Sequence, residues 1–185
     1  MSTKQIEKSA VEIQIPENVK VSLKGSMLHV QGPLGKVYKS FKKIPVLIEI
    51  NNNKILLKKT GERKKHLAIL NTSRSLIQTL CIGVVDGFTI KMKIVYSHFP
   101  ITVNIEGKKV LIKNFQGERA ARVSVIRGNT LVVAKGDDVI LTGPVLTDVS
   151  QTAANIQKNS KVKNKDHRVF LDGIYKYSQS KGIEK

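Results

Sequence analysis

The sequence predicts an α+β protein of two tandem related domains, each a small antiparallel β-sheet packed against one α-helix. Three observations support this fold class. Apolar and polar residues alternate in short runs that end at turn residues, as in half-buried strands. A similar set of runs occurs in both halves of the 185-residue chain. In each half, a segment with helical spacing follows the strands.

In the first half, the alternating runs end at proline and glycine, which interrupt strands. We expect strands that end before Pro16, before Gly25 and at the turn of residues 32–35. The alternating apolar residues are Ile13 and Ile15, then Val19, Val21 and Leu23, then Leu28 and Val30.

The second half repeats this pattern at a constant offset of 82 in the numbering. The offset relates Val19 to Ile101, Gly25 to Gly107, Val30 to Ile112 and Gly35 to Gly117. Chance resemblance between strands is the alternative, but the offset holds through two turns. Further on, residues 53–57 resemble 129–133 at an offset of 76, which we interpret as a difference in loop length. We therefore expect domains at 1–84 and 85–185, with a strand at 90–94 leading into the second.

Two helices are expected from apolar residues spaced three and four apart. The first runs from about Glu62 to Ile82, with Gly83 placed to end it. The second is shorter, from Asp148 or Ser150 to Lys158. The predicted apolar faces consist of Ile69, Ser73, Leu76, Ile77 and Leu80 in the first helix, and Ala153, Ala154 and Ile156 in the second.

Charge is the strongest functional signal. The chain has 32 Lys and Arg against 14 Asp and Glu, a formal net charge of +18. Residues 1–90 hold 15 basic and 6 acidic side chains, and residues 91–185 hold 17 and 8, so no single tail explains the surplus. A field of this strength favours a polyanionic partner, because binding releases counterions from phosphates. Nucleic acid is therefore the first hypothesis.

The basic residues form three clusters, and mutual repulsion within them destabilises a compact state unless an anion offsets it. The clusters are Lys36, Lys39, Lys42 and Lys43; Lys54, Lys58, Lys59, Arg63, Lys64 and Lys65; and Lys158, Lys161, Lys163, Lys165 and Arg168. The third has little hydrophobic periodicity, so we expect a segment that becomes ordered against phosphates. Aromatic content of 5% without tryptophan argues against a base-stacking module such as the RNA-recognition motif.

Catalytic and metal chemistry have little support. The four histidines are scattered, and the lone Cys81 lies in an apolar run where a buried side chain is expected. There is no phosphate-binding glycine loop, and the pair Asp137-Asp138 follows a glycine in an expected surface loop. We predict no enzyme activity, no cofactor, no metal and no small-molecule substrate. No apolar run approaches the ~20 residues of a membrane span, so we expect a soluble, intracellular protein with no membrane partner.

Several strings resemble a known family. The run Arg168-Val169-Phe170-Leu171-Asp172-Gly173-Ile174-Tyr175 is similar to the C-terminal signature of the large-subunit ribosomal protein L-six family, called L-nine in eukaryotic ribosomes. The segments 15–19, 30–35, 95–101 and 114–118 agree with that family in order. The signature resembles the archaeal and eukaryotic branch, and the resemblance covers nearly the whole chain.

The resemblance implies a structural constituent of the large ribosomal subunit that binds ribosomal RNA near the sarcin-ricin loop. Neighbouring large-subunit proteins would be its partners, and translation factors would dock nearby. It implies a cytoplasmic ribosomal location, with nucleolar assembly if the source is eukaryotic. An extra-ribosomal RNA-binding chaperone or assembly protein of the same fold is the alternative.

The RNA-contact residues we predict are basic or imidazole side chains around the third cluster and the strand entering the second domain. They are Lys158, Lys161, Lys163, Lys165, His167 and Arg168, with Lys91, Lys93 and His98 as second choices. Asp172, Gly173 and Tyr175 are expected to fix the fold of the tail, and Phe170 and Leu171 to pack.

Overall fold

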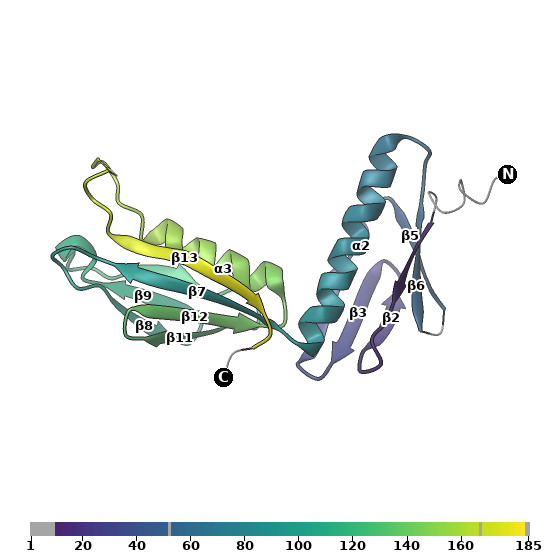
Figure 1. The fold of residues 1–185 in the computed structure, drawn as a ribbon, viewed down its shortest axis with the longest axis horizontal. Helices are drawn as coiled ribbons and strands as arrows, with labels where there is room; N and C mark the ends of the chain where they lie inside the picture. Colours follow the sequence, from purple (N-terminus) through teal and green to yellow (C-terminus); the bar gives the residue numbers. More distant parts are fainter. Residues whose placement is uncertain (1–9, 52, 167, 184–185) are drawn as a thin grey trace. The chain divides into compact units, whose positions relative to one another are not determined.

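The computed structural model describes residues 10–51, 53–166 and 168–183. The chain forms two compact units, Met1–Asp86 and Gly87–Lys185 (Figure 1). Each combines antiparallel sheets with a helix, so the predicted α+β class is confirmed. The strands of each unit form two small sheets instead of the single sheet expected.

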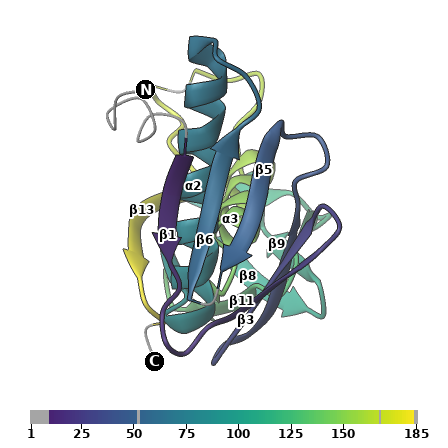
Figure 2. The ribbon, with the colours of Figure 1, turned by 90° about the vertical axis from the view of Figure 1, so that its right-hand side faces the viewer.

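The first unit contains two three-stranded sheets, in the orders β1-β6-β5 and β2-β3-β4. Figure 2 shows β1, β6 and β5 side by side in front of α2. The three strands expected from alternation are β1, β2 and β3. The strands of this unit are β1 (Ala10–Gln14), β2 (Lys20–Lys24), β3 (Met27–Gly32), β4 (Gly35–Ser40), β5 (Val46–Asn51) and β6 (Lys54–Lys59).

Helix α2 (Lys64–Val85) contacts both of these sheets. Ser73, Ile77 and Leu80 of the predicted apolar face are buried, whereas Ile69 and Leu76 are only partly buried. The buried hydroxyl of Ser73 donates to the carbonyl of Ile69 at 2.9 Å, which satisfies the only polar group on that face. The predicted helix and its orientation are therefore confirmed.

Gly83 does not end this helix, contrary to the prediction. It is buried inside α2, which continues to Val85. The amide N–H of Asp86 donates to the carbonyl of Ile82 at 2.8 Å, and Gly87 at φ +77° supplies the left-handed residue that stops the helix. Two glycines lie close to this helix end, and only the conformation tells which one terminates it.

By length and composition, α2 is apolar enough to cross a membrane, so the absence of such a run predicted from the sequence is wrong. Its contacts with β1, β3 and β6 identify it as the core helix of the first unit. Cys81 is buried on the helix, as expected, and burial raises the pKa of its thiol.

The turn at residues 32–35 packs against the end of α2. The amide N–H of Leu34 donates to the carbonyl of Val84 at 3.0 Å. Gly32 lies so close to the helix that a β-carbon there would be 2.7 Å from both the Val84 carbonyl oxygen and its Cγ2 atom. Only glycine permits this approach of strand to helix.

The second unit has a three-stranded sheet, β10-β9-β8, and a four-stranded sheet, β11-β12-β7-β13. Helix α3 (Leu146–Asn159) contacts β7, β12 and β13 of the larger sheet and β10 of the smaller one. The strands are β7 (Phe88–Val95), β8 (Thr102–Glu106), β9 (Lys109–Lys113), β10 (Arg122–Val125), β11 (Leu131–Lys135), β12 (Asp138–Gly143) and β13 (Gly173–Lys181), with a short 3₁₀ turn, η1 (Phe115–Gly117), before β10.

The topology supports the duplication but corrects part of the alignment. Strands β8 and β9 begin at the predicted offset of 82 from β2 and β3. The interpretation of residues 53–57 as counterparts of 129–133 is wrong. Strand β6 is the middle strand of β1-β6-β5, and its counterpart in β7-β12-β11 is β12, which begins at an offset of 84 from β6. Alternation alone does not reveal which strand occupies the middle of a sheet.

We expect Gly32→Ala to lower the free energy of unfolding by about 1–3 kcal/mol, because the added methyl group overpacks a backbone carbonyl that cannot move freely. Chemical denaturation of the full chain measures the change. The matched control is Gly25→Asn, at a turn glycine with φ +60° and no atom within 4 Å of the added β-carbon. Asparagine tolerates that conformation, so the control should change stability little. Equal effects of the two variants would contradict the close approach.

Candidate nucleic-acid interface

Arg122 joins the end of α3 to the loop before β10. Its guanidinium donates two hydrogen bonds to the Glu118 carboxylate, at 2.5 and 2.8 Å. The remaining Nη1 donates to the carbonyls of Asn159 and Lys161, both at 3.0 Å. The guanidinium also lies 4.0 Å from the centre of the Phe115 ring. One cation thus binds the carbonyl of the last helical residue and a carbonyl of the segment that follows the helix.

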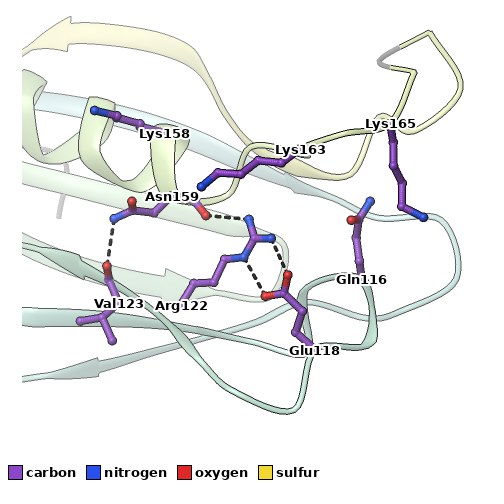
Figure 3. Close-up of a pocket in the computed structure, with 8 residues that line it drawn as sticks. All are labelled: Gln116, Glu118, Arg122, Val123, Lys158, Asn159, Lys163 and Lys165. Carbon is purple, nitrogen blue, oxygen red and sulfur yellow. Dashed lines mark hydrogen bonds and ion pairs between the residues drawn. The ribbon is translucent and has the colours of Figure 1, made fainter.

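An open cavity of about 640 Å³ lies beside Arg122. Figure 3 shows Arg122 between Glu118 and Asn159, while Lys163 and Lys165 reach in from the segment that follows α3. We call this the basic cavity. It is lined by Gln116, Glu118, Arg122, Val123, Lys158, Asn159, Lys163 and Lys165.

Among the described residues, no salt bridge joins a lysine of the basic cavity to a carboxylate. Within the described residues, Lys158, Lys163 and Lys165 form no ion pair, although Lys165 Nζ lies 4.6 Å from the centre of the Phe170 ring. Glu118 is the one carboxylate in the lining, and Arg122 already binds it. The Arg122 hydrogen bond holds the pKa of Glu118 below its usual range, assisted by the charge of Lys163. The remaining field of the cavity is therefore positive and suited to an anion.

The segment after α3 is anchored at both ends. Val162 is buried in the core of the second unit, with the exposed Lys161 and Lys163 on either side of it. The Ser160 hydroxyl oxygen accepts a hydrogen bond from the Ile174 amide at 3.0 Å, which ties the end of α3 to the start of β13. The loop carrying the lysines is thereby closed at its base.

Asp172 also holds this loop, as predicted. One carboxylate oxygen accepts from the Ser97 amide at 2.8 Å, and the other accepts from the Gln116 side chain at 3.5 Å. Gly173 begins β13 and packs close to the Tyr175 ring, with 2.8 Å between an added β-carbon and the Cζ atom. The packing role expected for Leu171 is wrong, because its side chain is 58% exposed.

The predicted contact residues separate into distinct groups. Lys158, Lys163 and Lys165 line the basic cavity, whereas Lys161 contributes only its carbonyl to the Arg122 network. Arg168 forms hydrogen bonds to Asp166, at 2.8 to 3.2 Å, which raise the pKa of the guanidinium. His167 lies outside the described residues.

The second-choice residues do not join the basic cavity. Ile90, Met92 and Ile94 point into the core, so Lys91 and Lys93 lie on the opposite face of β7. Lys93 is 3.5 Å from Asp138. His98 is exposed in the loop that follows β7. Lys91 and Lys93 of β7 therefore do not form one surface with the lysines of the basic cavity.

Sequence reasoning missed Arg122, Glu118 and Gln116. Arg122 lies outside the basic clusters, and it occupies an inward position of β10, opposite Ile112 in the register. Alternation gave no signal for Arg122, because in β10 the apolar Val123 and Val125 are exposed whereas Arg122 and Ser124 point inward. In the part of the chain that the structure describes, no group of three or more His, Cys, Asp or Glu could hold a metal ion.

We expect Arg122→Met to lower the free energy of unfolding by about 2–3 kcal/mol, because the variant lacks the charged hydrogen bonds to two carbonyls. Urea denaturation of the full chain measures this. Arg119→Met is the matched control, since it removes the same charge from an exposed position and should change stability by less than about 0.5 kcal/mol. A similar loss in both variants would show that net charge alone matters.

Glu118→Gln should lower stability at neutral pH by less than about 1 kcal/mol, because the ion pair is partly exposed and screened. The pKa of Glu118 is lower in the folded chain than its ordinary value of 4.5. The stabilisation is therefore complete above that ordinary value and disappears as the pH falls through the folded pKa. Unfolding curves of both proteins from pH 7 to pH 2 should converge at the acid end. A constant difference would contradict this assignment.

Comparison with known proteins identifies relatives along nearly the whole chain. The chain is 40% identical over 170 residues to the large ribosomal subunit protein uL6 of Methanosarcina mazei, covering 92% of this chain and 97% of that protein. It is 42% identical to the proteins of the same name from Staphylothermus marinus and Thermoplasma volcanium, covering 90% of this chain and 92% and 94% of theirs. No protein-family model matches the sequence. The identity and coverage show that the chain belongs to the large ribosomal subunit protein uL6 family, in its archaeal and eukaryotic branch.

Proposed function

We propose that this protein is a structural, non-enzymatic constituent of the large ribosomal subunit that binds ribosomal RNA through the basic cavity of its second unit. Its partners are the large-subunit RNA, at a site near the sarcin-ricin loop, and neighbouring large-subunit proteins, with translation factors docking nearby. Its location is the cytoplasmic ribosome. Membership in the uL6 family supports the ribosomal role.

The observation that carries the RNA-binding proposal is a set of lysines around the basic cavity that form no salt bridge within the described part of the chain. Lys158 extends from the last turn of α3, and Lys163 and Lys165 extend from the anchored segment that follows. Because the backbone carrying them is fixed by Arg122 and Ser160, less conformational entropy is lost when phosphates bind. Contacts of this kind position an RNA helix without reading its bases.

Arg168 is a further contact in this proposal. Its guanidinium is exposed and forms a fork with Asp166 two residues away. An exposed pair of this kind contributes little stability, and guanidinium groups bind phosphate with the same fork geometry. Exchange of Asp166 for a phosphate would therefore cost little. His167 and Lys161 remain predicted contacts on the same segment.

The triple variant Lys158→Gln, Lys163→Gln and Lys165→Gln should weaken binding to a large-subunit RNA fragment containing the sarcin-ricin loop. The slope of log affinity against log salt should fall by roughly 0.9 for each phosphate that is no longer bound. Filter binding at several salt concentrations measures both quantities. The matched control replaces Lys108, Lys109 and Lys135, which are exposed elsewhere in the second unit, and removes the same charge. Equal weakening in both triples would mean that only net charge drives binding.

Sedimentation of native lysate tests the ribosomal role itself. Quantitative mass spectrometry of each gradient fraction should find about one copy per large subunit, with release after ribonuclease treatment. A protein confined to light fractions or to pre-ribosomal particles would instead be an assembly factor or chaperone.

A further inference from the structure

The outer face of the sheet β2-β3-β4 has an unusual composition. The strand register places nine side chains on this face, in three rows that run across the strands. The rows are Lys20, Gln31 and Lys36; Ser22, His29 and Tyr38; and Lys24, Met27 and Ser40. Three of these nine are lysines and none is acidic. We call this the first-unit sheet face.

The opposite face of the same sheet is buried. Leu28, Val30 and Val37 are buried, and β3 and β4 contact α2. Since successive side chains on a strand point to opposite faces, the nine residues must point away from the helix. Tyr38 is 69% exposed, and its ring lies 6.3 Å from the ring of His29 with an angle of 40° between their planes.

The duplicated unit provides an internal comparison. In β10-β9-β8, the register row equivalent to Ser22, His29 and Tyr38 contains Asn104, Leu111 and Val123. Glu106 takes the place of Lys24 at the same offset of 82. The corresponding face of the second unit therefore has no ring in that row and includes a carboxylate. That face also carries Lys109 and Lys113, so the exposed ring and the lack of a carboxylate among the nine residues, more than the lysines, distinguish the first unit.

We propose that the first-unit sheet face is a second RNA-binding site that takes a short single-stranded segment. One base stacks on Tyr38, and Lys20, Lys24 and Lys36 bind the flanking phosphates. An exposed ring surrounded by lysines fits an unpaired base and its backbone, since stacking requires an accessible ring face and the charges match phosphate. This proposal rests on the proposed function, because it requires that the protein be part of a particle that contains RNA.

The spacing of the three side-chain rows fits a single-stranded RNA segment that crosses the sheet. Lys20 and Lys36 lie on one side of the Tyr38 row and Lys24 on the other, with about 7 Å between successive rows. A strand crossing the sheet can therefore keep phosphates near lysines on both sides of a stacked base. The RNA-recognition motif stacks two or three bases on paired aromatics, whereas this face presents the single exposed ring of Tyr38 and is proposed to stack one base.

The test uses the full chain and a fluorescein-labelled 12-nucleotide oligouridine, with fluorescence anisotropy at several salt concentrations. Tyr38→Ala should weaken binding about 5- to 100-fold, and Tyr38→Phe, which keeps the ring, should bind nearly as well as the parent. Replacing Lys20, Lys24 and Lys36 by Gln should reduce the salt slope by about 0.7 for each phosphate that is no longer bound. Val125→Ala, on the corresponding face of the second unit and outside the lining of the basic cavity, is the control and should have no effect.

The measurement is repeated in the variant lacking Lys158, Lys163 and Lys165. A Tyr38 effect that persists there belongs to the first unit, whereas weaker binding of the sarcin-ricin fragment by that variant reports on the proposed function alone. Thermal unfolding checks that Tyr38→Ala folds normally, as expected for so exposed a side chain. Unchanged oligouridine affinity in a folded Tyr38→Ala protein would overturn the site. Crosslinking of this face in large subunits to an acidic protein, with none to RNA, would also overturn it.

Discussion

The hydrogen bonds of Arg122 to the carbonyls of Asn159 and Lys161 are the constraint on which the candidate RNA site depends. A helix ends with carbonyls that lack partners, and the chain after it is free to leave in many directions. The guanidinium fixes that direction by binding both carbonyls while Glu118 and Phe115 hold it in place. Because the Arg122 guanidinium is held in place, it also fixes the positions of the lysines that follow α3.

The two units differ in the length of the helix and in the number of strands that pair in their sheets. In both units the helix contacts both sheets, and in the first the 22-residue α2 follows the last described strand, β6. In the second, α3 has 14 residues, and the chain returns as β13 to pair with β7 in the larger sheet. The return strand creates the loop between α3 and β13, and that loop carries the basic residues. A shorter helix and an added strand therefore give the second unit a surface that the first lacks.

Sequence periodicity predicted most of the elements, because alternation and helical spacing record which side chains face a core. It failed where the outcome depends on contacts between distant segments. Gly83 and Gly87 look alike as helix terminators, and the difference lies in burial at the first and a left-handed backbone at the second. At the site, charge density pointed to the segment carrying Lys163. Arg122 was missed because its role comes from carbonyls that lie far from it in the sequence, at the end of α3.

In a chain with a net charge of +18, the ion pairs show which basic residues are compensated within the fold. Lys54 and Lys58 in the first unit pair with Glu12 and Glu49, so their charges are largely compensated within the fold. The lysines of the basic cavity have no such partner in the described residues, and the nearby carboxylate of Glu118 is bound by Arg122. Repulsion among uncompensated charges opposes folding, so their persistence favours an external anion that offsets it. The contacts thus distinguish the paired Lys54 and Lys58 from the lysines of the basic cavity, although composition treats all of them alike.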